Sequence, residues 1–223
     1  MEKIPFGCGS LDAMLEGGVE AGCVTLIYGE AGTGKTTLCL LLARDMAKTG
    51  KKVIYLDTEG VSIDRLQQVS GPDFETVAKN ILFSNISNFD DQERMVDKAI
   101  KLAQSNVDVG MIIIDTISMH YRLTSREEDR ADRRSLAGQT TKLTNLAREK
   151  NLPVIVTSQV YTDVETGTYE ALGGHALHHN SKLILRVDKL RQSGMRRAVL
   201  IKARQLPEGL EADFRLTADG ISC

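Results

Sequence analysis

The chain has 223 residues, enough for one domain with a substantial core, whereas two full domains would be cramped. It carries 28 Lys and Arg against 30 Asp and Glu, for a formal net charge of -2. No apolar run approaches the roughly 18 residues that span a bilayer, and no charged-then-apolar leader opens the sequence. These features argue against a membrane protein. They predict a single soluble, cytoplasmic domain over residues 1–223.

The apolar content of the chain favours an α/β fold. Only 4% of the residues are aromatic and there is no tryptophan, while aliphatic runs alternate with polar helical segments. This composition suits a buried, parallel sheet better than an antiparallel sandwich. The four cysteines form no Cys-x-x-Cys pair and no metal-ligand spacing, and two of them lie in apolar runs, so we expect a reducing, intracellular setting.

Residues 1–22 are rich in glycine and turn-like around a short amphipathic segment, Leu11 to Leu15. They are too few for a domain of their own. We interpret them as a short lead-in to the first strand of the sheet.

A glycine-rich loop follows, and it is the most informative motif in the chain. It fits the phosphate-binding pattern G-x-x-x-x-G-K-[ST] in full, with an apolar run at 23–28 before it and apolar residues at helical spacing after it. In such a strand, loop and helix, backbone N–H groups surround an anion, Lys35 reaches the β- and γ-phosphates, and the Thr36 hydroxyl binds Mg²⁺. We therefore expect a nucleoside triphosphate as ligand. The candidate phosphate-binding residues are Gly29, Glu30, Ala31, Gly32, Thr33, Gly34, Lys35, Thr36 and Thr37.

Acidic residues end the next two predicted strands, at the edge where parallel sheets bind ligands. The strand at 52–59 ends in Asp57 and Glu59, and Glu59 could face the γ-phosphate and polarise a water. A surface carboxylate in a loop is the alternative for Glu59. The apolar run at 111–114 ends in Asp115, the expected Mg²⁺ ligand through a coordinated water, with Asp57 as the competing candidate. Gln159 ends the strand at 153–159 at the same edge, where its amide could sense a γ-phosphate.

The remaining predicted elements support the fold and carry no candidate catalytic residue. A helix is predicted over 62–69, a short strand over 81–83, and a helix from Asp90, with Glu93 three residues on as in a capping box. A further helix is expected from Leu136 to about Lys150. The polar segment 162–174 contains three glycines and predicts a loop.

Two segments are rich in bases. The run 122–134 has five arginines against four acids, so it is a solvated loop or helix start, with nucleic-acid contact as the lesser alternative. Residues 182–204 carry eight bases against Asp188 alone, a local charge of +7 on a chain of net charge -2. Their pattern predicts a β-hairpin that turns near 192–194. The bases either contact nucleic-acid phosphates or protect a sheet edge from pairing, and both roles can coexist.

Together, these motifs resemble the core of the RecA-type recombinases over nearly the full length. The matching segments are 26–37, 57–60, 112–115, 158–160 and 173–175, and residues 17–20 and 206–208 are more similar to the archaeal and eukaryotic members. The resemblance implies an α/β RecA-like P-loop ATPase core, a mostly parallel twisted sheet flanked by helices, with a C-terminal antiparallel basic hairpin. It implies ATP and Mg²⁺ as cofactors.

The resemblance also implies roles for individual residues. Glu59 would activate the attacking water, Gln159 would couple the γ-phosphate to the second DNA-binding loop, and His179 would sense the nucleotide. The Lys202 and Arg204 pair would reach the phosphates of a neighbouring subunit in trans. The DNA-facing loops would be 122–134 and 162–172. With the basic hairpin included, the candidate DNA-binding residues are Arg122, Arg126, Arg130, Lys189, Arg191, Arg196 and Arg197.

The sequence departs from that family in two ways. It lacks the N-terminal helix-hairpin-helix domain, and no Phe-x-x-Ala subunit-docking motif occurs in it. The interpretation we favour is therefore an ATP- and DNA-binding accessory factor of homologous recombination and DNA repair, a dimer or small oligomer. Its hydrolysis would be weak, insensitive to DNA and used as a switch, with little strand exchange. Expected partners are single-stranded DNA, an archaeal RadA-type recombinase and other recombination or repair proteins. The alternatives are a filament-forming strand-exchange recombinase and a ring-forming clock-type or helicase-type ATPase.

Overall fold

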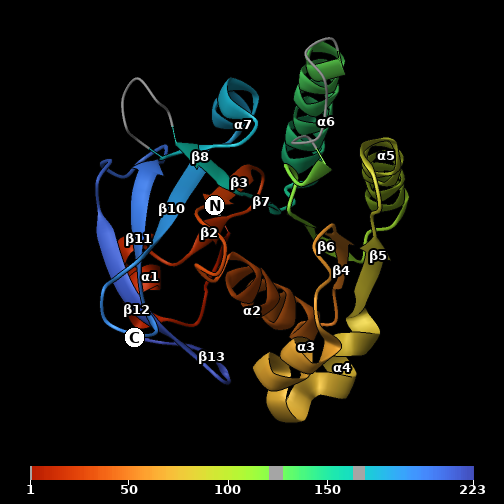
Figure 1. The fold of residues 1–223 in the computed structure, drawn as a ribbon. Helices are drawn as coiled ribbons and strands as arrows, with labels where there is room; N and C mark the ends of the chain where they lie inside the picture. The colour runs from red at the N-terminus through yellow and green to blue at the C-terminus, as the bar shows by residue number, and fades with distance from the viewer. Residues whose placement is uncertain (1, 121–127, 163–168) are drawn as a thin grey trace.

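The computed structural model describes residues 2–120, 128–162 and 169–223, with only the backbone of 128–131 and 162. Its largest feature is a nine-stranded sheet in the order β13-β12-β11-β10-β3-β7-β6-β4-β5 (Figure 1). The strands are β3 (Val24–Tyr28), β4 (Lys52–Asp57), β5 (Ile81–Asn85), β6 (Val109–Asp115), β7 (Val154–Ser158), β10 (Leu183–Lys189), β11 (Met195–Lys202), β12 (Glu211–Thr217) and β13 (Gly220–Ser222).

The six strands from β10 to β5 in this order run parallel, and β11, β12 and β13 add an antiparallel extension at one side. The predicted mostly parallel sheet and the C-terminal antiparallel hairpin are both confirmed. Strands β12 and β13 were not predicted from the sequence. Ala212, Phe214 and Leu216 of β12 do alternate with polar residues, and Leu216 packs against the core, so a strand signal was present and was overlooked.

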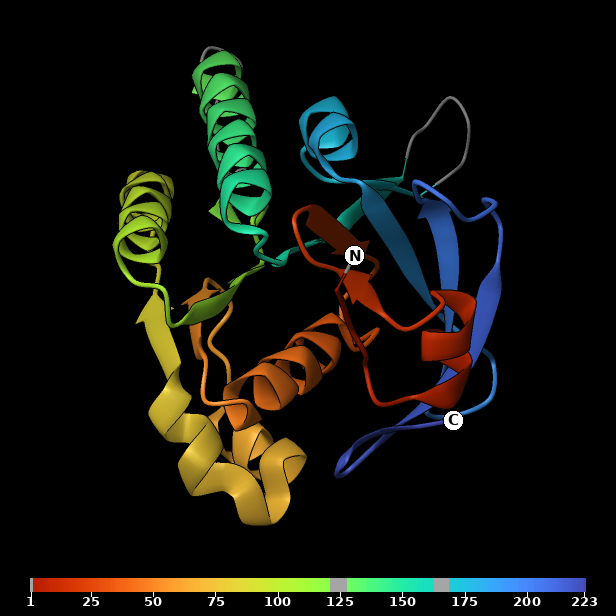
Figure 2. The same ribbon diagram turned by 180° about the vertical axis from the view of Figure 1, so that it is seen from behind.

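Helices cover both faces of the sheet (Figures 1 and 2). One face packs on α1 (Gly9–Met14), α2 (Lys35–Lys48), α3 (Ile63–Ser70) and α4 (Phe74–Asn80), with a 3-10 turn at Gly71–Asp73 between the last two. The other face packs on α5 (Phe89–Ser105), α6 (Glu128–Lys150) and α7 (Gly174–Asn180). Of the helices in the described ranges, none is long and apolar enough to cross a membrane.

Alternate residues of the central strands serve the two cores. Val24, Leu26 and Tyr28 of β3 face α5, α6 and α7, whereas Ile27 of the same strand faces α2. Side chains of a strand alternate between faces, and burial on both sides requires a continuous apolar run. These continuous apolar runs allow the central strands to be predicted from the sequence.

Three predicted boundaries differ from the structure. The cap of α5 is Asn88, whose side chain accepts a hydrogen bond from the Asp91 N–H at 2.9 Å, so the helix begins before Asp90. Helix α6 begins at Glu128 rather than near Leu136, inside the charged run. In the segment expected to be a loop, β8 (Val160–Thr162) pairs with β9 (Tyr169–Ala171), and α7 follows.

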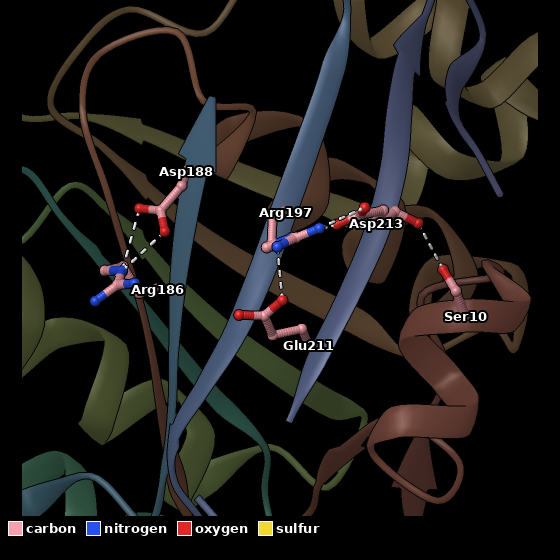
Figure 3. A network of polar contacts seen from close by, with 6 residues as sticks. All are labelled: Ser10, Arg186, Asp188, Arg197, Glu211 and Asp213. Carbon is pink, nitrogen blue, oxygen red and sulfur yellow. Dashed lines mark hydrogen bonds and ion pairs between the residues drawn. The ribbon is translucent and has the colours of Figure 1, made fainter. Parts of the chain in front are cut away.

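The lead-in holds β1 (Lys3–Ile4), α1 and β2 (Val19–Glu20), and it reaches back to the far end of the chain. Helix α1 lies against β12 (Figure 2), where the Ser10 hydroxyl donates to the Asp213 carbonyl at 2.9 Å (Figure 3). Cys8 and Cys223 form a disulfide with their Cα atoms 5.7 Å apart, across a sequence separation of 215. Cysteine spacing alone could not indicate this bond.

Candidate functional site

The phosphate loop connects β3 to α2 at the carboxyl edge of the parallel strands. Gly32 and Gly34 have φ angles of 73° and 102°, a left-handed region that glycine adopts readily. A Cβ on Gly29 would collide with the Val187 carbonyl of β10, so glycine is needed for the loop to pass that strand. The loop ends at the N-terminus of α2, whose unpaired N–H groups and partial positive charge favour an anion.

Lys35 is the first residue of α2, and its side chain folds back into the loop. Its Nζ donates to the carbonyl oxygens of Gly29 and Glu30, both at 2.9 Å, and the residue is only 6% exposed. Burial lowers the pKa of the Lys35 ammonium, an effect that the nearby Glu59 and Asp115 carboxylates oppose. The predicted phosphate-binding lysine is thus held in the loop by neutral carbonyls.

Asp115 lies at the end of β6 and is 1% exposed. Its Oδ2 accepts a hydrogen bond from the Tyr55 hydroxyl at 2.8 Å, and its Oδ1 accepts one from the Thr157 hydroxyl at 2.6 Å. Burial raises the pKa of the Asp115 carboxyl, while hydrogen bonds from Thr157, Thr36 and Tyr55 act in the opposite direction. Sequence reasoning missed Tyr55 and Thr157. The available signal was a polar group within each of two otherwise apolar strands.

The Thr36 hydroxyl lies close enough to the Asp115 carboxylate to lower its pKa, and the two oxygens fit an Mg²⁺ site. Mg²⁺ prefers oxygen ligands and usually binds one or two protein groups together with substrate phosphates and waters. Thr36 is also next to Lys35 at the start of α2, beside the loop that would hold the phosphates. The donor set at this point therefore suits the predicted cation.

Asp57, the competing candidate, is engaged in a turn. Its Oδ1 accepts from the backbone N–H groups of Glu59 at 3.1 Å and Gly60 at 2.9 Å, and its Oδ2 accepts from Val61 N–H at 2.6 Å. These bonds fix the chain that leaves β4. The geometry favours Asp115 for the cation and gives Asp57 the role of orienting Glu59.

Glu59 and Gln159 meet across the edge of the sheet, 100 residues apart in sequence. The Gln159 Nε2 donates to the Glu59 Oε1 at 2.7 Å, at an exposed position. The Gln159 backbone N–H donates to the Ser118 hydroxyl at 3.2 Å, which anchors the chain just after β7. The structure thus brings the two predicted catalytic side chains together near Lys35 and Asp115.

The trans candidates lie away from the phosphate loop of their own chain. Lys202 is paired with Ile184 near the amino end of β10, whereas Arg186 is paired with Tyr28, next to the loop. The Lys202 Nζ donates to the His178 carbonyl of α7 at 2.7 Å. Burial, followed by the charge of Lys182, lowers the pKa of Lys202. Arg204 follows β11, and His179 is exposed on α7.

The bases of the hairpin differ in their contact partners. The Arg196 Nη2 donates to the carbonyl of Gly32 in the phosphate loop at 3.0 Å. Arg197 instead forms ion pairs with Glu211 and Asp213 of β12, each at 2.7 Å (Figure 3).

Arg186 pairs with Asp188 at 3.0 Å in the same view (Figure 3). Lys189 and Arg191 are exposed at the turn end of the hairpin. The charge of +7 counted over 182–204 therefore overstates the basic surface, because β12 supplies acids to it. Of the predicted DNA-binding residues in the other segment, Arg122 and Arg126 lie outside the described residues, as does the side chain of Arg130.

A phosphate loop after a central strand, a mostly parallel sheet and helices on both faces define an α/β P-loop protein, the class to which RecA-like proteins belong. The family model described as Rad51 matches residues 1–223. Similar relatives include the "DNA repair and recombination protein RadB" of Methanococcoides burtonii, 40% identical over 99% of this chain and 97% of the relative. The protein of the same description from Thermoplasma acidophilum is 38% identical over 100% and 95%.

A solved structure described as the "RadB recombinase" superposes with a TM-score of 0.84 at 36% identity, covering 98% of both chains. The chain therefore belongs to the Rad51 family and, within it, to the RadB group of DNA repair and recombination proteins.

Proposed function

We propose that this protein is an ATP- and DNA-binding accessory factor of recombination, in which slow hydrolysis serves as a switch. Residues 1–223 would act as one RecA-like core domain in the cytoplasm, as a dimer or small oligomer. The observation that carries the nucleotide part is the convergence of the phosphate loop, the Thr36 and Asp115 pair, and the Glu59 and Gln159 contact at one edge of the sheet.

The side chains divide the chemistry between them. Lys35 would leave the carbonyls of Gly29 and Glu30 to bind the β- and γ-phosphates. Mg²⁺, held through Thr36 and Asp115, would offset the phosphate charge. Glu59 would accept a proton from the attacking water, with its carboxylate oriented by Gln159.

Gln159 links this chemistry to the rest of the chain. A γ-phosphate oxygen would compete with Glu59 for the Gln159 amide hydrogens. Because Gln159 directly precedes β8, the nucleotide state would be transmitted through Val160 and Tyr161 to the segment 162–172 that the family resemblance assigns to DNA.

The DNA-binding part of the proposal rests on Lys189 and Arg191, together with the loops 122–134 and 162–172. Both bases are exposed, whereas Arg197 is already paired with two carboxylates. Single-stranded DNA, a RadA-type recombinase and other repair proteins are the proposed partners. Slow hydrolysis is expected because Lys202 lies away from its own phosphate loop and would act only on a neighbouring subunit.

The experiment is to measure ATP turnover and light-scattering mass on one sample, with and without single-stranded DNA. We expect DNA binding, slow turnover that DNA does not change, and a mass no larger than a small oligomer. Strong stimulation with growth into filaments would instead support a strand-exchange recombinase. Hexameric rings would support a clock-type or helicase-type ATPase.

The nucleotide site has its own test in Lys35→Ala. This change should abolish ATP binding, because the phosphates lose the charge that the loop places among them. Lys101→Ala, on the exposed surface of α5, is the matched control and should bind a fluorescent ATP analogue like the wild type. Undiminished binding by Lys35→Ala would refute the site.

A further inference from the structure

We propose that Arg196 is a positioning residue that holds the phosphate loop in its anion-binding conformation from outside, through the Gly32 carbonyl. The inference rests on the proposed nucleotide site and adds to it a residue of the basic hairpin. On sequence alone, Arg196 reads as one base among eight that could face DNA.

The guanidinium of Arg196 is fixed at both of its terminal nitrogens. Its Nη2 donates to the Gly32 carbonyl at 3.0 Å, and its Nη1 donates to the Met195 carbonyl of its own strand at 2.8 Å. Strand β11 lies between β10 and β12, with Arg196 opposite Lys189 on one side and Phe214 on the other. The arginine is therefore attached to the rigid sheet, while the carbonyl that it holds belongs to a loop 164 residues away.

Gly32 is a flexible point of the loop, where such a contact restrains the backbone. Its φ of 73° belongs to the left-handed region, and glycine leaves that region easily because it lacks a Cβ. In a trans peptide the carbonyl and the next N–H point in opposite directions. An arginine that holds the Gly32 carbonyl outward therefore turns the Thr33 N–H inward, where it makes a long 3.4 Å contact with the Glu30 carbonyl. An inward N–H is what a phosphate oxygen requires.

Other outer contacts act in the same direction. The Glu30 side chain lies close enough to Tyr169 of β9 to raise the pKa of the tyrosine hydroxyl, and both residues line one cavity with Gly29. The Lys189 Nζ lies 3.7 Å from the position that a Cβ on Gly32 would occupy. The loop is thus contacted on its outer side by both the β8–β9 and the β10–β11 hairpins, with Arg196 making the contact to its backbone.

The neighbouring residue supplies the matched control. Successive side chains of a strand point to opposite faces, and Arg197 accordingly pairs with Glu211 and Asp213, not with the loop (Figure 3). The two arginines are identical in type and adjacent in sequence. They differ in whether they contact the phosphate loop.

The proposed role gives a specific pattern of affinities. A loop held ready in its bound conformation loses less conformational freedom on binding, so Arg196→Ala should weaken ligands that use the loop. ATP and ADP both place a β-phosphate there, so both should bind about 3- to 10-fold more weakly, as expected for loss of one partly exposed charge-assisted hydrogen bond. KM for ATP should rise by the same factor while kcat changes little. A direct contact to the γ-phosphate would instead weaken ATP and spare ADP.

The test combines hydrogen exchange of the peptide covering residues 29–37, without nucleotide, with binding of fluorescent ATP and ADP analogues. Arg196→Ala should exchange faster in this peptide and lose affinity for both ligands. Arg196→Lys, which keeps the charge but lacks the planar pair of donors, should show the same changes to a smaller degree, and it serves alone if Arg196→Ala does not fold. Arg197→Ala should match the wild type in both measurements.

The outcomes separate this inference from the proposed function. Unchanged exchange and unchanged affinities in both Arg196 variants would overturn the positioning role. So would a loss of affinity for ATP alone, since that assigns Arg196 to the γ-phosphate. If the wild type binds neither nucleotide, the proposed function fails, yet faster exchange in Arg196→Ala would still support the contact as a restraint on the loop.

Discussion

Tyr55 shows how much of the candidate site depends on residues that would never touch the nucleotide. Its ring is fully buried in β4, and its hydroxyl donates to the Asp115 carboxylate at 2.8 Å. Burying a carboxylate costs desolvation free energy, and hydrogen bonds from donors offset that cost. A carboxylate that loses one donor is therefore less stable in its buried position. Tyr55 of the neighbouring strand β4 therefore helps to stabilise the charged form of Asp115.

Tyr55→Phe tests this dependence. Removing the hydroxyl should lower the free energy of unfolding by about 1–3 kcal/mol and weaken Mg²⁺-dependent nucleotide binding, because the carboxylate is less well stabilised. Urea unfolding and Mg²⁺ titration of analogue binding measure the two effects. Tyr161→Phe, at an exposed position, is the control and should leave both unchanged. Equal stability of Tyr55→Phe and wild type would contradict the argument.

At the scale of residues, the sequence could identify groups whose positions follow from local pattern. Lys35 and Thr36 follow from the loop motif, and Asp115 and Gln159 follow from their places at strand ends. Arg196 and Arg197 could not be separated in this way. Both are arginines in one strand, and their different partners, Gly32 for one and the β12 acids for the other, come from distant parts of the chain.

At the scale of elements, the β10–β11 hairpin joins the phosphate loop to the proposed DNA-binding surface. Arg196 contacts Gly32, Lys189 lies opposite Arg196 and also beside Gly32, and the turn beyond them presents Arg191. At least two bases of the hairpin therefore have structural roles, because Arg196 binds the phosphate loop and Arg197 binds β12. The exposed bases near the turn are therefore the ones expected to reach DNA.

Lys189→Ala combined with Arg191→Ala should weaken DNA binding about uniformly across sequences, because phosphates carry no sequence information. If both bases touch duplex phosphates, the log-log salt slope should become shallower by up to about 1.8. Fluorescence anisotropy over a salt series measures this. Arg197→Ala should keep the wild-type slope. A double variant with an unchanged slope would leave these bases the role of protecting the hairpin from unwanted pairing.

The contact between β11 and β12 predicts a pH dependence. Arg197, by hydrogen bond and charge, holds the pKa of the Asp213 carboxyl below its usual value of 3.8. A carboxyl with a lowered pKa in the folded state stabilises the fold above its unfolded pKa and loses that contribution as the pH falls. Asp213→Asn should therefore melt below the wild type at pH 7, and the gap should close as the pH drops below 3.8. A constant gap in thermal melts from pH 3 to 7 would argue against the ion pair.

The elements that the sequence could not predict share a physical reason. The strands of the parallel sheet are buried on both faces and have continuous apolar runs, whereas β12 lies in the antiparallel extension and shows only the weaker alternation of Ala212, Phe214 and Leu216. The start of α6 falls in a run of charged residues with no apolar stripe to mark it. For α5, a polar residue just upstream of the predicted start, Asn88, proved to be the cap.

At the scale of the whole molecule, the disulfide between Cys8 and Cys223 fastens α1 and the C-terminal strands together. The cysteine spacing predicts a reducing compartment without disulfides, and the Cys8–Cys223 bond disagrees with that prediction. Spacing carries no information on contacts between distant segments. The contact between α1 and β12 is equally long-range. It joins Ser10 to Asp213, about 200 positions apart in the sequence. Contacts of this range follow only from the complete fold.

Cys8→Ser should lower the free energy of unfolding by about 2–5 kcal/mol, because the unfolded chain is released from a very long closed loop. Thermal or urea unfolding measures the change. Reductant should lower the stability of the wild type to that of Cys8→Ser and should not affect the variant further. A wild type that is insensitive to reductant would mean that the bond does not contribute to stability.

The same bond makes the polypeptide from residue 8 to residue 223 a covalent ring. A protease that nicks one exposed turn opens the ring without releasing a fragment, so the cleaved protein keeps its mass until the disulfide is reduced. The two ends of the ring have their Cα atoms 5.7 Å apart, so a peptide linker could replace the disulfide while new termini are opened in another turn. Such a permutant would keep the nine strands of the large sheet but would lack residues 1–7, including β1 and the buried Ile4 and Phe6.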